Sequence, residues 1–279
     1  MALPVLPISI VALVTIVASA LTILGYLRYI PDVILMVRNP WRVLSVPKHV
    51  ISVYRFKRFW RPIVGDGQVL VVFPAKDLDD HRDGTTRFDH EGLHHLLNDL
   101  NKYFRHLEVE PVSDEEFGRG HKDYNIISVA GPIPNRVSVE LLTDPNVAFT
   151  FDRLQTKKFI NSIVSPGEDV SLDPVTYYDE SEAGPVCTKD YGILTRSTSP
   201  YNSDRLIVNA AGGYGEGTKA GCQLLRDPSV LATLTKKGGD RFQAVYGVPV
   251  SASGALKAPY ILDEDSSEWP FDAPPVVKL

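Results

Sequence analysis

The chain of 279 residues is 44% hydrophobic, which is enough for one sizeable core or two small ones. Its net charge of -5 argues against a nucleic-acid surface extending over the whole chain, so no nucleic-acid partner is expected. The two cysteines, Cys187 and Cys222, are too few and too far apart for a disulfide framework or a cysteine metal site, and we expect free thiols.

Residues 1–30 are predicted to form a transmembrane anchor. No charged residue occurs from position 2 to position 27, and the apolar run 8–27 is as long as a bilayer-spanning helix requires. A cleaved signal peptide is the alternative. However, no Lys or Arg precedes the run, and the run is longer than the roughly 7–15 residues of a signal core. We therefore expect a retained single-pass helix.

Residues 31–64 are interpreted as a basic interfacial linker. Asp32 is the only acidic residue between Arg28 and Arg61, and the positive-inside rule then places this flank in the cytoplasm. The N-terminus is expected outside, and residues 65–279 are expected in the cytosol. Aromatic residues alternate with the basic ones, which favours contact with anionic lipid; they are Trp41, Tyr54, Phe56, Phe59 and Trp60.

Residues 65–279 are predicted to form one cytosolic α/β domain. Short apolar runs at 68–73, 124–130 and 206–211 are typical of buried parallel strands. Further strands are expected at 107–112, 190–196 and 240–248, and helices at 88–104 and 137–142. Strands that alternate with helices indicate a Rossmann-like, mostly parallel sheet.

A glycine-rich turn lies between the strand 206–211 and the helix that follows it. The turn contains Gly212, Gly213, Gly215 and Gly217, and Thr218 opens the helix. Glycines allow positive φ and a close approach of a ligand to the backbone. A helix N-terminus behind such a turn presents free N–H groups and the positive end of the helix dipole. The pattern predicts a phosphate or nucleotide cradle, and a tight turn without a ligand is the alternative.

A second turn, from Gly131 to Asn135, follows the strand 124–130 and precedes a helix that begins near Arg136. Ligands of open α/β sheets bind beyond the carboxyl ends of the strands, where both turns would lie. We expect backbone N–H groups of residues 131–135 and 212–218 to bind a nucleotide-like or other anionic ligand, assisted by the side chains of Arg136 and Thr218.

The two turns, AGPIPN at 130–135 and AGGYGEGT at 211–218, resemble the glycine turns of the LOG/SLOG group of Rossmann-like proteins. Some members of that group hydrolyse nucleoside monophosphates at the glycosidic bond, and others sense nucleotide-derived ligands beside membrane effectors. In the group, the later turn is followed by an acidic residue on the helix. Here Lys219, Ala220 and Gly221 follow Thr218. The resemblance therefore implies ligand binding more than hydrolysis.

Residues 90–94 match the zinc-peptidase pattern H-E-x-x-H. On a helix, His90 and His94 would lie on one face and bind zinc, while Glu91 would act as general base on the metal's water. Gly92 weakens such a helix. The alternative is a solvated helix face that follows the first strand of the sheet.

Three functions stay open at this point. The first is a membrane-anchored sensor or regulatory module that binds a nucleotide-like ligand. The second is a membrane-anchored hydrolase, either a zinc peptidase at His90, Glu91 and His94 or a nucleotide glycosidase at the glycine turns. The third is a structural or assembly protein that binds no small molecule. The sequence specifies no cofactor, and it is compatible with a homo-oligomer.

Overall fold

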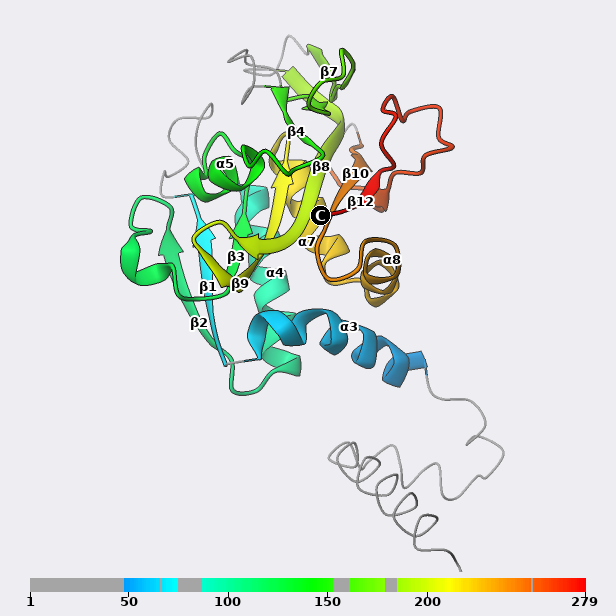
Figure 1. Cartoon of the computed structure of the whole chain (residues 1–279). Helices are drawn as coiled ribbons and strands as arrows, with labels where there is room; N and C mark the ends of the chain where they lie inside the picture. The colour runs from blue at the N-terminus through cyan, green and yellow to red at the C-terminus, as the bar shows by residue number, and fades with distance from the viewer. Residues whose placement is uncertain (1–47, 66, 75–86, 153–160, 179–184, 252) are drawn as a thin grey trace, which may run out of the picture. The chain divides into compact units, whose positions relative to one another are not determined.

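The computed structural model describes residues 48–65, 67–74, 87–152, 161–178, 185–251 and 253–279 (Figure 1). Residues 52–279 form one compact unit. Its helices are α3 (Lys48–Val64), α4 (Arg87–Tyr103), the short η3 (Arg119–His121), α5 (Arg136–Leu142), α7 (Gly215–Leu224) and α8 (Pro228–Gly238). Its strands are β1 (Gln68–Phe73), β2 (Glu108–Ser113), β3 (Ile126–Val129), β4 (Thr150–Phe151), β5 (Ile163–Val164), β6 (Ser171–Leu172), β7 (Val175–Tyr178), β8 (Pro185–Ser199), β9 (Asn202–Gly212), β10 (Phe242–Pro249), β11 (Tyr260–Ile261) and β12 (Val276–Lys278).

The central sheet has a parallel and an antiparallel part. Its strand order is β11-β10-β8-β9-β3-β1-β2, with β12 paired to β10 and β7 paired to β8. Strands β2, β1, β3 and β9 are parallel, as expected for an α/β domain. The long β8 forms a hairpin with β9 and starts the antiparallel part, which the sequence does not predict. A separate antiparallel sheet contains β4, β5 and β6.

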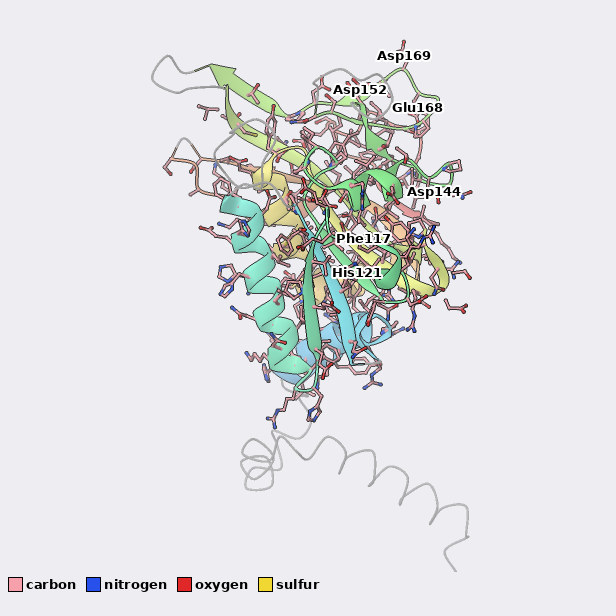
Figure 2. The ribbon with its side chains drawn as sticks, turned by 90° about the vertical axis from the view of Figure 1, so that its left-hand side faces the viewer. Phe117, His121, Asp144, Asp152, Glu168 and Asp169 are labelled. Carbon is pink, nitrogen blue, oxygen red and sulfur yellow. The ribbon has the colours of Figure 1, made fainter. Side chains whose placement is uncertain are left out.

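Helices cover both faces of the central sheet, because alternate residues of each buried strand point to opposite sides. Val69 and Val71 of β1 pack with α3, α4, α7 and α8 in the largest core. Leu70 and Val72 of β1 pack with α5 on the other face. Figure 2 shows α4 and α5 on opposite sides of the sheet. The small sheet β4-β5-β6 covers the remainder of the α5 face through Phe151, Ile163 and Leu172.

Helix α3 belongs to the domain, so the predicted linker 31–64 and the domain start at 65 need correction. Residues 56, 59, 60, 63 and 64 recur at helical spacing and are all buried in the largest core. The indole N–H of Trp60 donates to the carbonyl oxygen of Leu225 at 3.2 Å. Phe56, Phe59 and Trp60 thus pack against protein instead of lipid.

The predicted anchor, residues 1–30, lies outside the described residues. Among the helices that the structure describes, none combines the length and the apolar character needed to cross a bilayer.

Candidate ligand-binding edge of the sheet

The two predicted glycine turns lie side by side at the edge where β1, β3 and β9 end. Val129 of β3 pairs with Ala210 of β9, and the turns follow directly. A Cβ added to Gly131 would clash with the carbonyl oxygen of Gly212. Glycine at position 131 is therefore required by the contact between the turns. The strands β1 and β3 are neighbours whose next helices, α4 and α5, cover opposite faces of the sheet. Open α/β sheets bind ligands at such switch points.

The turn 130–135 contains a strained residue. Ala130 has φ of 99°, and it is the only residue other than glycine with positive φ in the described part of the chain. Such a conformation costs of order 1–3 kcal/mol and is often found at functional sites. Here it is held in place from both sides. The Ala130 N–H donates to Ala210 O at 3.1 Å, and its carbonyl accepts from the Ser138 hydroxyl at 2.9 Å.

Asn135 caps α5 and leaves few N–H groups of this helix for a ligand. Its side-chain oxygen accepts from the N–H groups of Val137 and Ser138 at 3.0 and 3.3 Å. Its side-chain nitrogen donates to Val129 O at 2.9 Å and to the Ser128 hydroxyl at 3.1 Å. Asn135 is fully buried, so its role in the structure is that of a helix cap.

Arg136 is the exposed basic group beside this turn. Its backbone N–H donates to Asp114 Oδ2 at 3.1 Å, and its guanidinium donates to Phe117 O at 2.7 Å. Glu140 lies 3.9 Å from the guanidinium, at a position one helical turn onward. The side chain remains 52% exposed, so the guanidinium has free donors at the edge of the sheet.

The turn 212–218 is occupied by a side chain of the protein itself. Asp190 of β8 is fully buried, and its Oδ2 accepts from the N–H groups of Tyr214 and Gly217 at 2.9 and 2.6 Å. Its Oδ1 accepts from the N–H of Tyr191 at 2.8 Å. A Cβ on Gly213 or Gly217 would lie within 2.9 Å of an Asp190 oxygen. Glycine at these two positions makes room for a carboxylate of the protein itself.

Two further N–H groups of this turn are also used internally. Gly213 N donates to Tyr191 O at 2.8 Å, and Gly212 N donates to the Thr218 hydroxyl at 3.3 Å. None of the glycines between 212 and 217 has positive φ. The predicted reason for them, left-handed backbone, is therefore wrong, whereas close approach to neighbouring groups accounts for them.

Burial gives this turn acidic groups with raised pKa. Removal from water raises the pKa of Asp190 from its ordinary 3.8 to about 7, against the lowering effect of its three N–H donors and with a further increase from Glu216. The pKa of Glu216 is raised as well, mainly by burial. Carboxyl groups that titrate near neutrality are common at functional sites.

A row of buried polar side chains crosses the α5 face of the sheet below the two turns. Ser128, Asn209, Thr195 and Gln243 are directly paired neighbours on β3, β9, β8 and β10, and each is at most 1% exposed. Gln243 accepts from the N–H groups of Ala148 and Phe149 and donates to Phe149 O. Asn209 Oδ1 accepts from the Ser138 hydroxyl at 2.9 Å. The row fixes α5 and the segment before β4 onto the sheet.

The residues of the H-E-x-x-H pattern do not converge. His90 and His94 are exposed on α4, and the ring of His94 shares a hydrogen bond with Asn98 at 2.9 Å. Glu91 forms an ion pair with Lys219 of α7 at 2.5 Å. Within the described ranges, no three His, Cys, Asp or Glu side chains are arranged to hold a metal ion.

Gly92, at the centre of the same pattern, has a packing role. A Cβ at this position would lie 3.0 Å from Lys219 Cα and 3.2 Å from Cys222 Cβ. Helices α4 and α7 thus cross closely at Gly92. This close crossing accounts for the glycine in the middle of α4. A zinc site is not needed to explain it.

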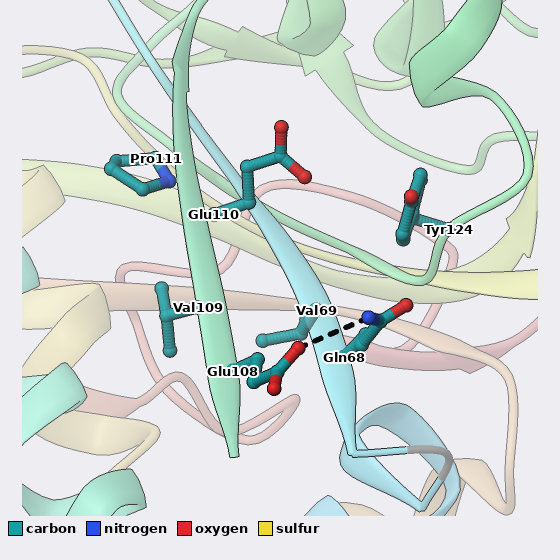
Figure 3. A pocket seen from close by; sticks show the side chains of 7 residues that line it. All are labelled: Gln68, Val69, Glu108, Val109, Glu110, Pro111 and Tyr124. Atoms are coloured by element: carbon teal, nitrogen blue, oxygen red, sulfur yellow. Dashed lines mark hydrogen bonds between the residues drawn. The ribbon is translucent and has the colours of Figure 1, made fainter.

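A shallow hollow of about 290 Å³ lies at the other end of the parallel strands (Figure 3). It is lined by Gln68, Val69, Glu108, Val109, Glu110, Pro111 and Tyr124. Gln68 donates to Glu108 across it at 3.1 Å. Its charged groups are glutamates, which do not suit an anionic ligand.

From the sequence, Lys189-Asp190-Tyr191 lies at the end of a predicted strand near this edge, but charges at a strand end are usually at the surface, so the sequence alone assigns Asp190 no role. The sequence feature that points to Asp190 is its position between Lys189 and the apolar run that begins at Tyr191. The structure brings Gly131, Arg136 and the glycine turn to one edge, and it places His90 and His94 on a separate helix. Comparison with models of known protein families yields no match to this chain, and comparison with curated proteins yields none either.

Proposed function

We propose that the protein is a membrane-anchored regulatory domain with a Rossmann-like parallel half-sheet, which binds a nucleotide-like or other anionic ligand at the edge where β1 and β3 end. The supporting observation is the divergence of α4 and α5 to opposite faces at this edge, directly beside the contact between Gly131 and Gly212. Pockets of open α/β sheets form where successive helices diverge in this way.

The hydrogen bonds of the two turns suggest how such a ligand would be held. The N–H groups of Tyr214 and Gly217 already bind Asp190, so they are released to an anion only when this carboxyl group moves or becomes protonated. The guanidinium of Arg136 is half exposed and needs no rearrangement. Arg136 is therefore the main anion contact in this proposal, and residues 131–135 supply the adjoining backbone.

Thermal melting of the full-length chain in detergent against nucleotides, sugar phosphates and divalent metals tests the proposal. A ligand at 100 times its Kd should stabilise the fold by about 2.7 kcal/mol and raise Tm accordingly. The Arg136→Ala variant should weaken binding roughly tenfold or more, because a charge-assisted contact is lost. The control is Arg119→Ala, which removes an exposed arginine on η3 and should leave the shift unchanged.

A domain without a small ligand is the second candidate. It is favoured by one specific observation, since Asp190 occupies two N–H groups of the turn 212–218, and Asn135 occupies two N–H groups at the start of α5. If no compound in the panel raises Tm, the ligand-binding proposal fails and an assembly role becomes the better explanation.

A further inference from the structure

Helix α3 has one face that packs on the domain and one face that packs on nothing described. Tyr54, Arg55, Arg58 and Arg61 follow each other at the spacing of one helix face, and all four are exposed. The ring of Tyr54 is 50% exposed. We call these four residues the arginine face. The opposite side of the helix is buried in the core, so the arginine face has a fixed orientation relative to the sheet.

The arginine face carries positive charge without acidic partners. Helix α3 has five basic residues and no acidic one. Arg136, Arg196 and Arg226, by contrast, each form an ion pair, as Arg226 does with Asp99 at 2.6 Å. None of the ion pairs found among the described residues involves Arg55, Arg58 or Arg61. Like charges one helical turn apart repel each other, so an anionic surface laid over the three would relieve that repulsion.

Acidic side chains gather at the end of the domain away from α3, and Glu108 and Glu110 also line the hollow at the end where the parallel strands start. Figure 2 shows Asp144, Asp152, Glu168 and Asp169 at that end, over the face that contains α5 and β4. The whole chain has a net charge of -5, so the basic face of α3 stands out against the charge of the rest. The basic residues of α3 therefore form a local patch, and a local patch of positive charge attracts a negatively charged surface.

The position of α3 in the chain identifies that surface. Residues 31–47 separate α3 from the predicted anchor, residues 1–30, and 17 residues span at most about 60 Å even when fully extended. We propose that the arginine face docks on anionic phospholipid headgroups, with Tyr54 at the level of the headgroups. The proposal rests on the proposed membrane location of the chain.

Docking of this face sets which edge of the sheet faces away from the bilayer. Helix α3 ends at Val64, just before β1 begins at Gln68, so it lies at the edge where the parallel strands start (Figure 1). Gly131 and Gly212 lie at the opposite edge, where these strands end. A docked domain therefore presents its candidate ligand edge to the aqueous side.

A fluorescent label on the arginine face tests the proposal with the full-length chain. Cys187 and Cys222 are both buried, so a Tyr54→Cys substitution introduces the one readily accessible thiol of the described residues. The labelled chain is mixed with vesicles of phosphatidylcholine alone or with about 30% phosphatidylserine. We expect the label to report an apolar environment only with phosphatidylserine, and about 0.5 M salt to reverse the change.

Matched charge variants distinguish docking through the arginine face from nonspecific attraction of basic residues to anionic lipid. Arg55→Gln with Arg58→Gln should reduce the ratio of docked to undocked chain about fivefold for each arginine, or about twenty-five-fold together. Arg119→Gln with Lys257→Gln removes two exposed charges elsewhere and should have little effect. All four side chains are exposed, so unchanged Tm values should show that both variants fold.

Three results would overturn the proposal. The first is the same label signal with and without phosphatidylserine. The second is an equal loss of docking in both charge variants. The third is a signal that rises with protein concentration in the absence of lipid, which would identify a second copy of the chain as the partner. Extraction by alkaline carbonate tests the anchor separately, since an extractable chain whose label still responds to phosphatidylserine would disprove the anchor and support docking.

Discussion

Asn in place of Asp190 should change how the stability of the domain depends on pH. In the folded protein, burial raises the pKa of Asp190 from 3.8 to about 7, so the folded chain keeps a proton that the unfolded chain releases. Each unit of pKa difference between the two states is worth about 1.4 kcal/mol, which gives about 4 kcal/mol over the whole range. This stabilisation is fully present below pH 3.8 and is lost as pH rises towards 7.

The assay is urea unfolding of the full-length chain in detergent from pH 5 to pH 8, followed through tryptophan fluorescence, to which buried Trp60 contributes. The free energy of unfolding of the wild type should fall relative to that of Asp190→Asn by about 1.4 kcal/mol per pH unit between pH 5 and 6.5, and the difference should level off above pH 7.5. Glu216→Gln, which changes a neighbouring acid, should retain most of this slope. A difference that increases with pH would show that the three N–H donors outweigh burial, and would refute the reasoning.

Two further predictions concern packing. Phe59→Ala should destabilise the domain by about 3–5 kcal/mol, because the ring is fully buried against Trp60, Phe242 and Arg196. The control is Tyr54→Ala, on the exposed side of α3, which should change the free energy of unfolding by about 0.5 kcal/mol or less. If the two substitutions lower the free energy of unfolding equally in chemical denaturation, α3 does not pack in the core as described. Gly92→Val should cost about 1–3 kcal/mol through the crossing of α4 and α7, and His90→Val on the exposed side of α4 should be nearly neutral. If Gly92→Val melts at the wild-type temperature, α4 and α7 do not cross closely at Gly92.

The parallel half of the sheet was predictable because its strands are short apolar runs between helices. The predicted run 68–73 coincides with β1, and the predicted helix 88–104 differs from α4 by one residue at each end. The direction of β8 was not predictable in the same way. A two-residue connection, Pro200 and Tyr201, joins β8 to β9 and forces an antiparallel hairpin, but the strand pattern alone does not report direction.

The candidate site was predictable as a location and not as a set of contacts. Glycines at 131 and 212 indicated two turns, and their place after buried strands indicated a common edge. What fills the turns depends on Asp190, which reaches Gly217 across a separation of 27 residues in the chain. Helix α3 shows a related difficulty, since Phe56, Phe59 and Trp60 have the spacing of a buried helix face, yet their basic neighbours also suit a lipid surface.

The polar row across β3, β9, β8 and β10 selects one alignment of four strands. A shift of two residues keeps every side chain on its own face, so hydrophobic patterning alone tolerates it. Such a shift of β9 would set Asn209 beside Ile126 or Ala130 in place of Ser128, and would carry it away from the Ser138 hydroxyl that donates to it. Each buried polar group that loses its partner costs about 1–3 kcal/mol. The row thus distinguishes the native pairing from shifted pairings that bury the same apolar area.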